Sequence, residues 1–300
     1  MKTTRTIFLL FALTLSLSVY SQRLGTHVET VQFQSKLVGK TLPYSVVLPV
    51  EYAQPGKETI RYPVLYLLHG LAGHYSNWLS KTRLSEYAAR YSVIIITPEG
   101  NDGWYTDSAT VAADKYETYI VQELIPNVES RYRALKGREG RSIAGLSMGG
   151  YGALKFGLKY PDKFLFAASI SGALDAARRT VDNPGNAWDF LRPSIMQTFG
   201  AADNPTRAAN DLLKLVRDLP AERIASLPFF YLDCGTEDGF LASNRELATS
   251  FLERKIPHEY RQLPGQHNWA YWDQQVQEVL KVAAQKMDVK SRQLAVGSGQ

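Results

Sequence analysis

The sequence is poor in cysteine and in excess charge. It contains one cysteine among 300 residues, so no disulfide can form within the chain. Cys234 lies in an apolar run, which predicts an inert buried thiol and a fold stabilised by its hydrophobic core. The formal net charge is only +5 and the basic residues are scattered, which argues against nucleic acid as a partner.

Long hydrophobic runs are also scarce, and the one present lies at the N-terminus. Residues 7–19 are apolar except for Thr and Ser, follow Lys2 and Arg5, and precede small residues typical of a cleavage site. A run of about 13 residues cannot cross a bilayer, which needs ~20. We therefore predict a signal peptide over residues 1–21 rather than a membrane anchor. The mature protein is expected to be secreted or periplasmic, without stable membrane insertion.

Apolar patterns in the rest of the chain predict alternating strands and helices. Residues 26–52 are typical of two strands of an antiparallel hairpin at a sheet edge. Later apolar runs lack clean alternation, as strands buried on both faces do, at 62–68, 93–97, 142–145, 164–170 and 229–232. Helical spacing occurs between them, at 78–89, 113–131, 149–160, 243–253 and 269–286. The predicted fold class is α/β, with a mostly parallel central sheet, an N-terminal antiparallel hairpin and helices on both faces.

The interior of the chain favours one domain, because it has no repeat and no Ser/Gly/Pro-rich linker. We assign this domain to residues 22–289 and treat residues 290–300 as a C-terminal tail. The stretch 172–227 is longer than a single crossover helix requires. It is predicted to be an insertion over the top of the sheet, where lids and substrate walls are usually built.

The segment 145–150 carries the first chemical signal. It matches G-x-S-x-G, with a predicted strand leading in and a predicted helix leading out. In such a turn, strand and helix approach so closely that the positions flanking the serine must be glycine. We therefore predict that Ser147 is a nucleophile in a nucleophile elbow. The alternative is a glycine-rich structural turn.

A serine nucleophile needs a base, which lies downstream of it in this architecture. Of the five histidines, only His258 and His267 follow the serine. His267 lies in a loop between a predicted last strand and the final helix, and loops at the C-terminal ends of strands carry the reactive groups. His267 is therefore the predicted base, and His258 is interpreted as a surface or strand-end residue.

The acid that orients the base is less clearly marked. Asp233 continues the predicted strand 229–232, whereas Glu237 and Asp238 lie in the loop that follows. A loop residue can reach the far nitrogen of the base and stabilise the imidazolium. Asp238 is the favoured acid and Asp233 the alternative. Either aspartate can also serve as a helix cap or turn former.

Two backbone N–H donors are needed to stabilise an oxyanion. Met148 directly follows the predicted nucleophile, at the positive end of the predicted helix. The second donor is expected from the loop after an earlier strand, where Gly70 allows a tight turn and Leu71 follows. His69 and His74 in the same loop lack partners at ligand spacing, so no metal site is predicted.

Four segments together resemble one enzyme family. They are residues 67–73 with Trp78, 103–107, 143–153 and 264–269. The chain is similar to the esterase D family of α/β hydrolases over about residues 26–285. That family includes S-formylglutathione hydrolases, short-chain carboxylesterases, and acetylxylan and feruloyl esterases of carbohydrate esterase family 1. The resemblance implies a serine esterase without a cofactor, with a triad of Ser147, Asp238 and His267 and oxyanion donors Leu71 and Met148.

Export and the resemblance favour acetyl or feruloyl esters of plant polysaccharide, such as xylan, as the substrate. Five aromatic residues are candidates for a sugar or aromatic platform, with core packing as the alternative for each: Trp104, Tyr105, Tyr151, Trp269 and Trp272. S-formylglutathione hydrolases carry a Gly/Ala-rich aromatic stretch where this chain has residues 101–105, which argues against that activity. A general short-chain carboxylesterase and an acyltransferase of the same fold are the alternatives. An intact triad argues against a non-catalytic binding protein.

Overall fold

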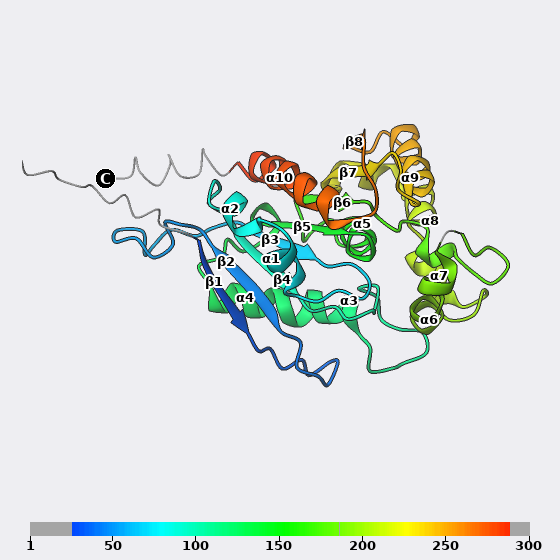
Figure 1. Ribbon diagram of the computed structural model, residues 1–300, viewed down its shortest axis with the longest axis horizontal. Helices are drawn as coiled ribbons and strands as arrows, with labels where there is room; N and C mark the ends of the chain where they lie inside the picture. Colours follow the sequence, from blue (N-terminus) through cyan, green and yellow to red (C-terminus); the bar gives the residue numbers. More distant parts are fainter. Residues whose placement is uncertain (1–25, 186, 289–300) are drawn as a thin grey trace, which may run out of the picture.

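The computed structural model describes residues 26–185 and 187–288, which form one eight-stranded sheet covered by helices (Figure 1). The strands are β1 His27–Val31, β2 Tyr44–Leu48, β3 Val64–Leu68, β4 Ile94–Pro98, β5 Arg141–Leu146, β6 Phe166–Ile170, β7 Phe229–Gly235 and β8 His258–Leu263. Their order across the sheet is β1-β2-β4-β3-β5-β6-β7-β8. The pairs β1–β2 and β2–β4 are antiparallel and all others are parallel. The predicted mostly parallel sheet and N-terminal antiparallel hairpin are confirmed.

Helices connect most of the parallel strands. The α-helices are α1 Asn77–Lys81, α2 Leu84–Ala88, α3 Tyr116–Tyr119, α4 Ile125–Arg131, α5 Met148–Lys159, α6 Trp188–Phe199, α7 Pro205–Asn210, α8 Leu212–Arg217, α9 Leu241–Glu253 and α10 Trp269–Lys286. A π-helix, η1 Ile120–Leu124, joins α3 to α4, and the 3-10 helices are η2 Arg138–Gly140, η3 Ala176–Arg178 and η4 Ala221–Ser226. No helix within the described residues is both long and apolar enough to cross a membrane. The predicted signal peptide and C-terminal tail lie outside the described residues.

Residues 78–89 form two helices rather than the one that their spacing predicts. The main-chain N–H groups that would continue the first helix donate to side-chain oxygens instead. The Thr82 hydroxyl accepts the N–H of Leu84 at 3.2 Å, and Asp273 Oδ1 of α10 accepts the N–H of Arg83 at 2.8 Å. Because these oxygens compete with main-chain carbonyls, the chain turns between α1 and α2.

The hydrophobic core is divided between the two faces of the sheet. Successive side chains of a strand point to opposite faces. In β3, Val64, Tyr66 and Leu68 join the cluster that contains residues of α3, α4, α5, α8 and α9. Leu65 and Leu67 join the cluster that contains residues of α1, α2 and α10. All five are fully buried, so β3 has no polar face, which explains its unbroken apolar sequence.

The lone cysteine belongs to this core. Cys234 is fully buried in β7, as its apolar setting predicts. Burial raises the pKa of its thiol, because the charged thiolate is poorly solvated inside the sheet. Cys234 is therefore an inert packing residue at neutral pH.

Residues 172–227, called the insertion below, connect β6 to β7 and contain η3, α6, α7, α8 and η4. Helices α6 and α7 lie at one end of the molecule (Figure 1). One buried side chain holds this segment together: the Arg207 guanidinium donates to the carbonyl oxygens of Ala177, Arg179, Gly200 and Ala201. These carbonyls lie on both sides of α6 in the sequence, so Arg207 ties the segments before and after α6 to each other.

Candidate active site

Three polar side chains meet at the C-terminal edge of the parallel strands. Ser147 follows β5, Asp238 lies in the loop after β7, and His267 lies in the loop after β8. Parallel strands end at the same edge of a sheet, so residues far apart in the sequence come together there. This edge, with the loops after β3, β4, β5, β7 and β8, is called the rim below.

Ser147 occupies a strained turn between β5 and α5. Its backbone has φ 53° and ψ −116°, a conformation that side-chain-bearing residues rarely adopt. A Cβ at Gly145 would lie 2.4 Å from the backbone of Gly149, and a Cβ at Gly149 would lie 2.6 Å from the carbonyl oxygen of Leu68. The predicted reason for both glycines, the close approach of strand and helix, is confirmed. The turn presents the serine hydroxyl at the N-terminus of α5.

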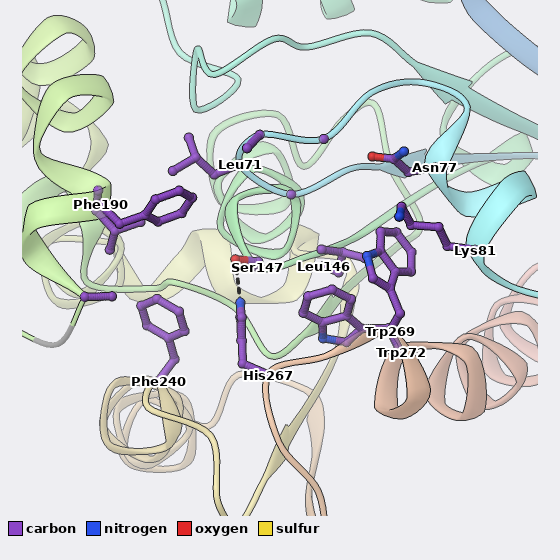
Figure 2. A pocket seen from close by; sticks show the side chains of 15 residues that line it. Leu71, Asn77, Lys81, Leu146, Ser147, Phe190, Phe240, His267, Trp269 and Trp272 are labelled. Atoms are coloured by element: carbon purple, nitrogen blue, oxygen red, sulfur yellow. Dashed lines mark hydrogen bonds between the residues drawn. The ribbon is translucent and has the colours of Figure 1, made fainter.

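A continuous chain of hydrogen bonds joins the three side chains. The His267 Nε2 lies 3.0 Å from Ser147 Oγ (Figure 2), and His267 Nδ1 lies 2.8 Å from Asp238 Oδ2. An ionised carboxylate can only accept, so Nδ1 carries the proton and Nε2 accepts from the serine hydroxyl. The imidazole is held by Phe240 and Trp272, whose ring centroids each lie 4.9 Å from its own. This arrangement can move a proton from the serine to the imidazole.

The Asp238 carboxyl is completely shielded from solvent. Burial is the largest single influence and raises the pKa of this carboxyl, but the hydrogen bond and charge of His267, together with smaller interactions, lower it more. The N–H of Phe240, which donates to Oδ1 at 2.8 Å, adds to the lowering. The pKa of Asp238 therefore lies below its usual range. The ionised group can stabilise the imidazolium that forms when the histidine takes a proton.

The other candidates for acid and base lie elsewhere. Asp233 is fully buried within β7, where its Oδ1 accepts the hydroxyl of Tyr271 at 3.1 Å and burial raises its pKa to about 7. Glu237 is exposed. His258 begins β8 and contacts a main-chain carbonyl oxygen two residues before it at 2.8 Å. Within the described part of the chain, none of the three contacts His267 or the serine.

Two main-chain N–H groups beside the serine have no partner among the described residues. They belong to Met148, the first residue of α5, and to Leu71, in the loop after β3. The first N–H groups of a helix lack an intrahelical acceptor and lie at the positive end of its dipole. Two such donors can hydrogen-bond the oxyanion of a tetrahedral intermediate.

The loop that carries Leu71 is held by the loop after β4. The Ala72 N–H donates to Asp102 Oδ1 at 2.7 Å, with Ala72 in the left-handed conformation at φ 54°. The Tyr105 hydroxyl donates to the carbonyl oxygen of His69 at 3.1 Å. These bonds, between residues about thirty positions apart, hold the donor loop in one conformation before any substrate binds.

No three His, Cys, Asp or Glu side chains of residues 26–185 and 187–288 are grouped so as to hold a metal ion. His69 shows why its loop is not such a site. Its Nδ1 contacts the carbonyl oxygen of Gly70 at 2.8 Å and its Nε2 accepts the N–H of Gly100 at 2.9 Å. Both ring nitrogens are therefore used by the main chain.

A cavity of about 380 Å³ lies over Ser147 (Figure 2). The rim contributes residues 70–73, Leu146, Ser147, Phe240 and His267, and the helices α1 and α10 contribute Asn77, Lys81, Trp269 and Trp272. The insertion contributes three further lining residues, Ala187, Phe190 and Leu191. This volume is in the range that accommodates a small-molecule ligand.

Three of the five aromatic candidates for a substrate platform belong to the core, the alternative given for each from the sequence. Trp104, Tyr105 and Tyr151 are fully buried and do not line the cavity, which corrects the prediction for these positions. Each directs its polar atom to an internal acceptor, on Ser194, His69 and Asn210 respectively. A packed aromatic residue with an internal partner has the same sequence signature as one that binds substrate. Trp269 does line the cavity, together with Trp272.

Several lining residues were not predicted from the sequence. Phe190 and Leu191 come from α6, Phe240 from the loop after β7, and Asn77 and Lys81 from α1. The only sequence signal for Phe190 and Leu191 is that they lie in residues 172–227, a segment longer than a single crossover helix requires. The others line the cavity because the tertiary structure brings α1 and the loop after β7 together at the C-terminal edge of the sheet.

Comparison with known proteins places the chain among esterases. The sequence model of the Esterase family matches residues 35–282. An acetyl esterase of Caldicellulosiruptor saccharolyticus is 30% identical over 255 residues, covering 82% of this chain and 94% of that protein. The structure of a ferulic acid esterase is 27% identical with a TM-score of 0.73, covering 87% of this chain and 99% of that one. Fluorophosphonate-binding serine hydrolase F of Staphylococcus aureus, 24% identical with a TM-score of 0.75 over 87% and 99% of the two chains, shares the fold.

The family match includes all the strands that end at the rim, from β3 to β8, and both the segments before and after the insertion. The acetyl esterase is similar over almost its whole length, so the likeness is not confined to a short motif. The chain therefore belongs to the Esterase family, within the esterase D and carbohydrate esterase family 1 group, and is a carboxylic ester hydrolase of the α/β-hydrolase fold.

Proposed function

We propose that this hydrolase is a secreted serine esterase with Ser147, His267 and Asp238 as its catalytic triad. The observation that carries the proposal is the unbroken hydrogen-bond chain from Ser147 Oγ through the imidazole to the shielded carboxylate. Its outer end opens into the cavity, where an ester can reach the serine. The strained backbone of the elbow supports the same role, because it presents the hydroxyl clear of the sheet.

In the first step Ser147 Oγ attacks the ester carbonyl carbon while His267 Nε2 takes the hydroxyl proton. The resulting imidazolium keeps its Nδ1–H bond to Asp238. Because the pKa of Asp238 lies below its usual range, the carboxylate stays ionised and the proton stays on the imidazole.

The negative charge that develops on the carbonyl oxygen is bound by the N–H groups of Leu71 and Met148. A donor of this kind stabilises the transition state by ~3 kcal/mol. Asp102 and Tyr105 act behind the donor loop and keep the Leu71 N–H in position. No reorganisation is then needed as the charge appears.

When the intermediate collapses, the ester C–O bond breaks and the alcohol leaves with the proton held by His267. The acyl group remains on Ser147 Oγ. Water then attacks the acyl-enzyme, gives a proton to His267, and releases the carboxylic acid with the serine restored. An acceptor alcohol in place of water would lead to acyl transfer by the same residues.

The proposed substrates are acetyl or feruloyl esters of plant polysaccharide such as xylan. The cavity supports this class because Phe190, Phe240, Trp269 and Trp272 give it aromatic walls suited to a feruloyl ring or a sugar face. The relatives named acetyl esterase and ferulic acid esterase point to the same acyl groups. A signal peptide over residues 1–21 would bring the enzyme to such an extracellular polymer.

The test compares steady-state hydrolysis by the mature chain and its Ser147→Ala variant, on matched acetyl and feruloyl esters of xylo-oligosaccharides. We expect kcat to fall about 10⁴-fold or more in the variant. Ser130→Ala, on the exposed side of α4, is the control and should retain full activity. Hydrolysis that persists in Ser147→Ala would contradict the proposed nucleophile.

The same assay decides the substrate. Release of feruloyl groups identifies a feruloyl esterase, and release of acetyl alone identifies a deacetylase of xylan. Cleavage of simple acetyl esters only would favour a general short-chain carboxylesterase. A product that forms only when an acceptor alcohol is present would identify an acyltransferase.

A further inference from the structure

The cavity over Ser147 has two ends of different character. Phe190 and Phe240 lie on one side of the serine, whereas Asn77, Lys81 and Trp269 lie on the other (Figure 2). The first end is apolar. The second carries the only permanently charged side chain among the described residues that line the cavity, the ammonium group of Lys81. An ester that spans the serine therefore meets an apolar wall on one side and a cation on the other.

Lys81 is not neutralised by the protein. Among the described residues it has no ion pair and no side-chain hydrogen bond, and its nearest recorded contact is the Trp269 ring, with Nζ 6.0 Å from the centroid. Arg83, two positions on, differs in this respect, because its Nε lies 3.8 Å from Asp273 Oδ2. Asp273, the acidic residue that follows Trp269 most closely in the sequence, is thus paired with Arg83 rather than with Lys81. Its carboxylate also accepts the hydroxyl of Tyr87 at 2.9 Å.

The surface under Lys81 is rigid. The Trp269 ring packs edge-on against Trp78 and Trp272, with centroids at 5.7 and 5.0 Å, and Trp78 is fully buried. A second hollow of about 380 Å³ shares Lys81 and Trp269 with the cavity over Ser147 and is also lined by Arg83 and Asp273. Lys81 therefore stands between the cavity and an adjoining hollow, where it can reach a group on a substrate lying across Trp269.

We propose that Lys81 binds a carboxylate carried by the ester, so that this enzyme prefers anionic over neutral substrates. The proposal rests on the proposed esterase function of the same cavity. Two substrate classes share the chemistry: esters whose alcohol is acidic, such as an acylated uronic-acid sugar, and esters whose acyl group carries a second carboxylate. The uncompensated ammonium group, placed on an aromatic platform beside the reactive serine, supplies the charge-assisted hydrogen bond for either.

The experiment uses two matched pairs of aryl esters. 3-Acetoxybenzoate and 3-acetoxybenzamide differ in charge on the alcohol half, and phenyl 3-carboxybenzoate and phenyl 3-carbamoylbenzoate differ in charge on the acyl half. The ratio of kcat/KM for the anionic and neutral member is measured in the native chain and in Lys81→Gln. We expect the ratio to fall about three- to tenfold in Lys81→Gln for one pair, through KM. The pair that responds identifies the half of the ester that faces Lys81.

Lys36→Gln is the matched control, because this exposed lysine lies on the loop after β1 and does not line the cavity. It changes the net charge equally and should leave both ratios unchanged. High ionic strength should reduce the anionic preference of the native chain and have little effect in Lys81→Gln. Unchanged ratios in Lys81→Gln, or an equal fall in Lys36→Gln, would overturn the proposal.

Binding to a chain without the nucleophile separates this proposal from the esterase function. In Ser147→Ala, the dissociation constants of 3-acetoxybenzoate and phenyl 3-carboxybenzoate are compared with those of their amides, with and without Lys81→Gln. Weaker binding of one anion on loss of Lys81 supports the site even if no ester is hydrolysed by the native chain. Equal binding in both backgrounds refutes it even if hydrolysis is rapid.

Discussion

The rim and the insertion contribute to one cavity in different ways. Rim side chains are held by hydrogen bonds at strand ends, as in the chain from Ser147 to Asp238 at 3.0 and 2.8 Å. The insertion contributes Ala187, Phe190 and Leu191, which are apolar, and Phe190 is 62% exposed. The candidate triad therefore lies on rigid strand ends, while part of the cavity wall is formed by a segment outside the sheet.

The two regions also differ in what holds them. The donor loop of the rim is braced by Asp102 and Tyr105, which themselves follow β4. The insertion is organised around Arg207, whose partners are carbonyl oxygens of the insertion itself. Phe190, which is exposed and makes none of these bonds, can therefore be changed to alter which ester binds without moving Ser147, His267 or Asp238. Three substitutions test this separation.

Asp238→Asn should break the rim without unfolding it. An amide cannot hold the Nδ1–H tautomer of His267 or stabilise the imidazolium, so kcat should fall about 10⁴-fold for every ester. Steady-state kinetics on acetyl and feruloyl esters, with the melting temperature as a check of folding, measure this effect. Glu237→Gln, an exposed neighbour, is the control and should remain active. A nearly native rate in Asp238→Asn would move the acid to Asp233.

Asp233→Asn tests whether the buried aspartate of β7, just before the loop of Asp238, affects the stability of the fold rather than the activity of the rim. Burial raises its pKa to about 7, so the folded chain keeps a proton that the unfolded chain loses above about pH 4. The native free energy of unfolding should therefore fall as pH rises from about 4 to 7 and stay low above it.

Asp233→Asn should not show this fall in the free energy of unfolding, because the amide, like the protonated carboxyl, stays uncharged at every pH. Its gain in stability over the native chain should be near zero at pH 4 and at most about 4 kcal/mol at pH 8. Urea unfolding at both pH values measures it, and esterase activity should change little. A stability difference that is the same at both pH values would show that Asp233 does not titrate in this range.

Phe190→Ala tests the insertion. Removal of the ring takes apolar surface from the cavity wall, so KM for a feruloyl ester should rise about two- to tenfold, while an acetyl ester changes less. Val181→Ala is the control, since Val181 is 57% exposed in the same segment but does not line the cavity. An equal fall in kcat for both esters would show that the insertion also positions the reacting groups.

Much of this molecule could be predicted from local sequence patterns. Apolar runs without alternation predicted the buried strands, and the alternation in residues 26–52 predicted the antiparallel edge. The positions of Gly145 and Gly149 around Ser147 predicted a turn whose steric reason is visible in the structure. The chain order of serine, aspartate and histidine named three side chains that the structure places within hydrogen-bond distance.

The sequence alone was insufficient where the outcome depends on distant contacts. Trp104 and Trp269 are both aromatic residues beside a predicted loop, yet the first is fully buried and the second lines the cavity. The break between α1 and α2 depends on Asp273, about 190 positions away, and it places Lys81 at the end of a short helix.

The fold class and the candidate triad could thus be predicted from the sequence alone, because turn sterics, strand burial and motif spacing are properties of neighbouring residues. Which side chains line the cavity over Ser147 depends on the tertiary structure. Phe190, Phe240 and Lys81 come from three separate segments that meet only when the sheet brings their loops to one edge. The burial or exposure of these side chains depends on contacts between segments distant in the sequence, which no local sequence pattern predicts.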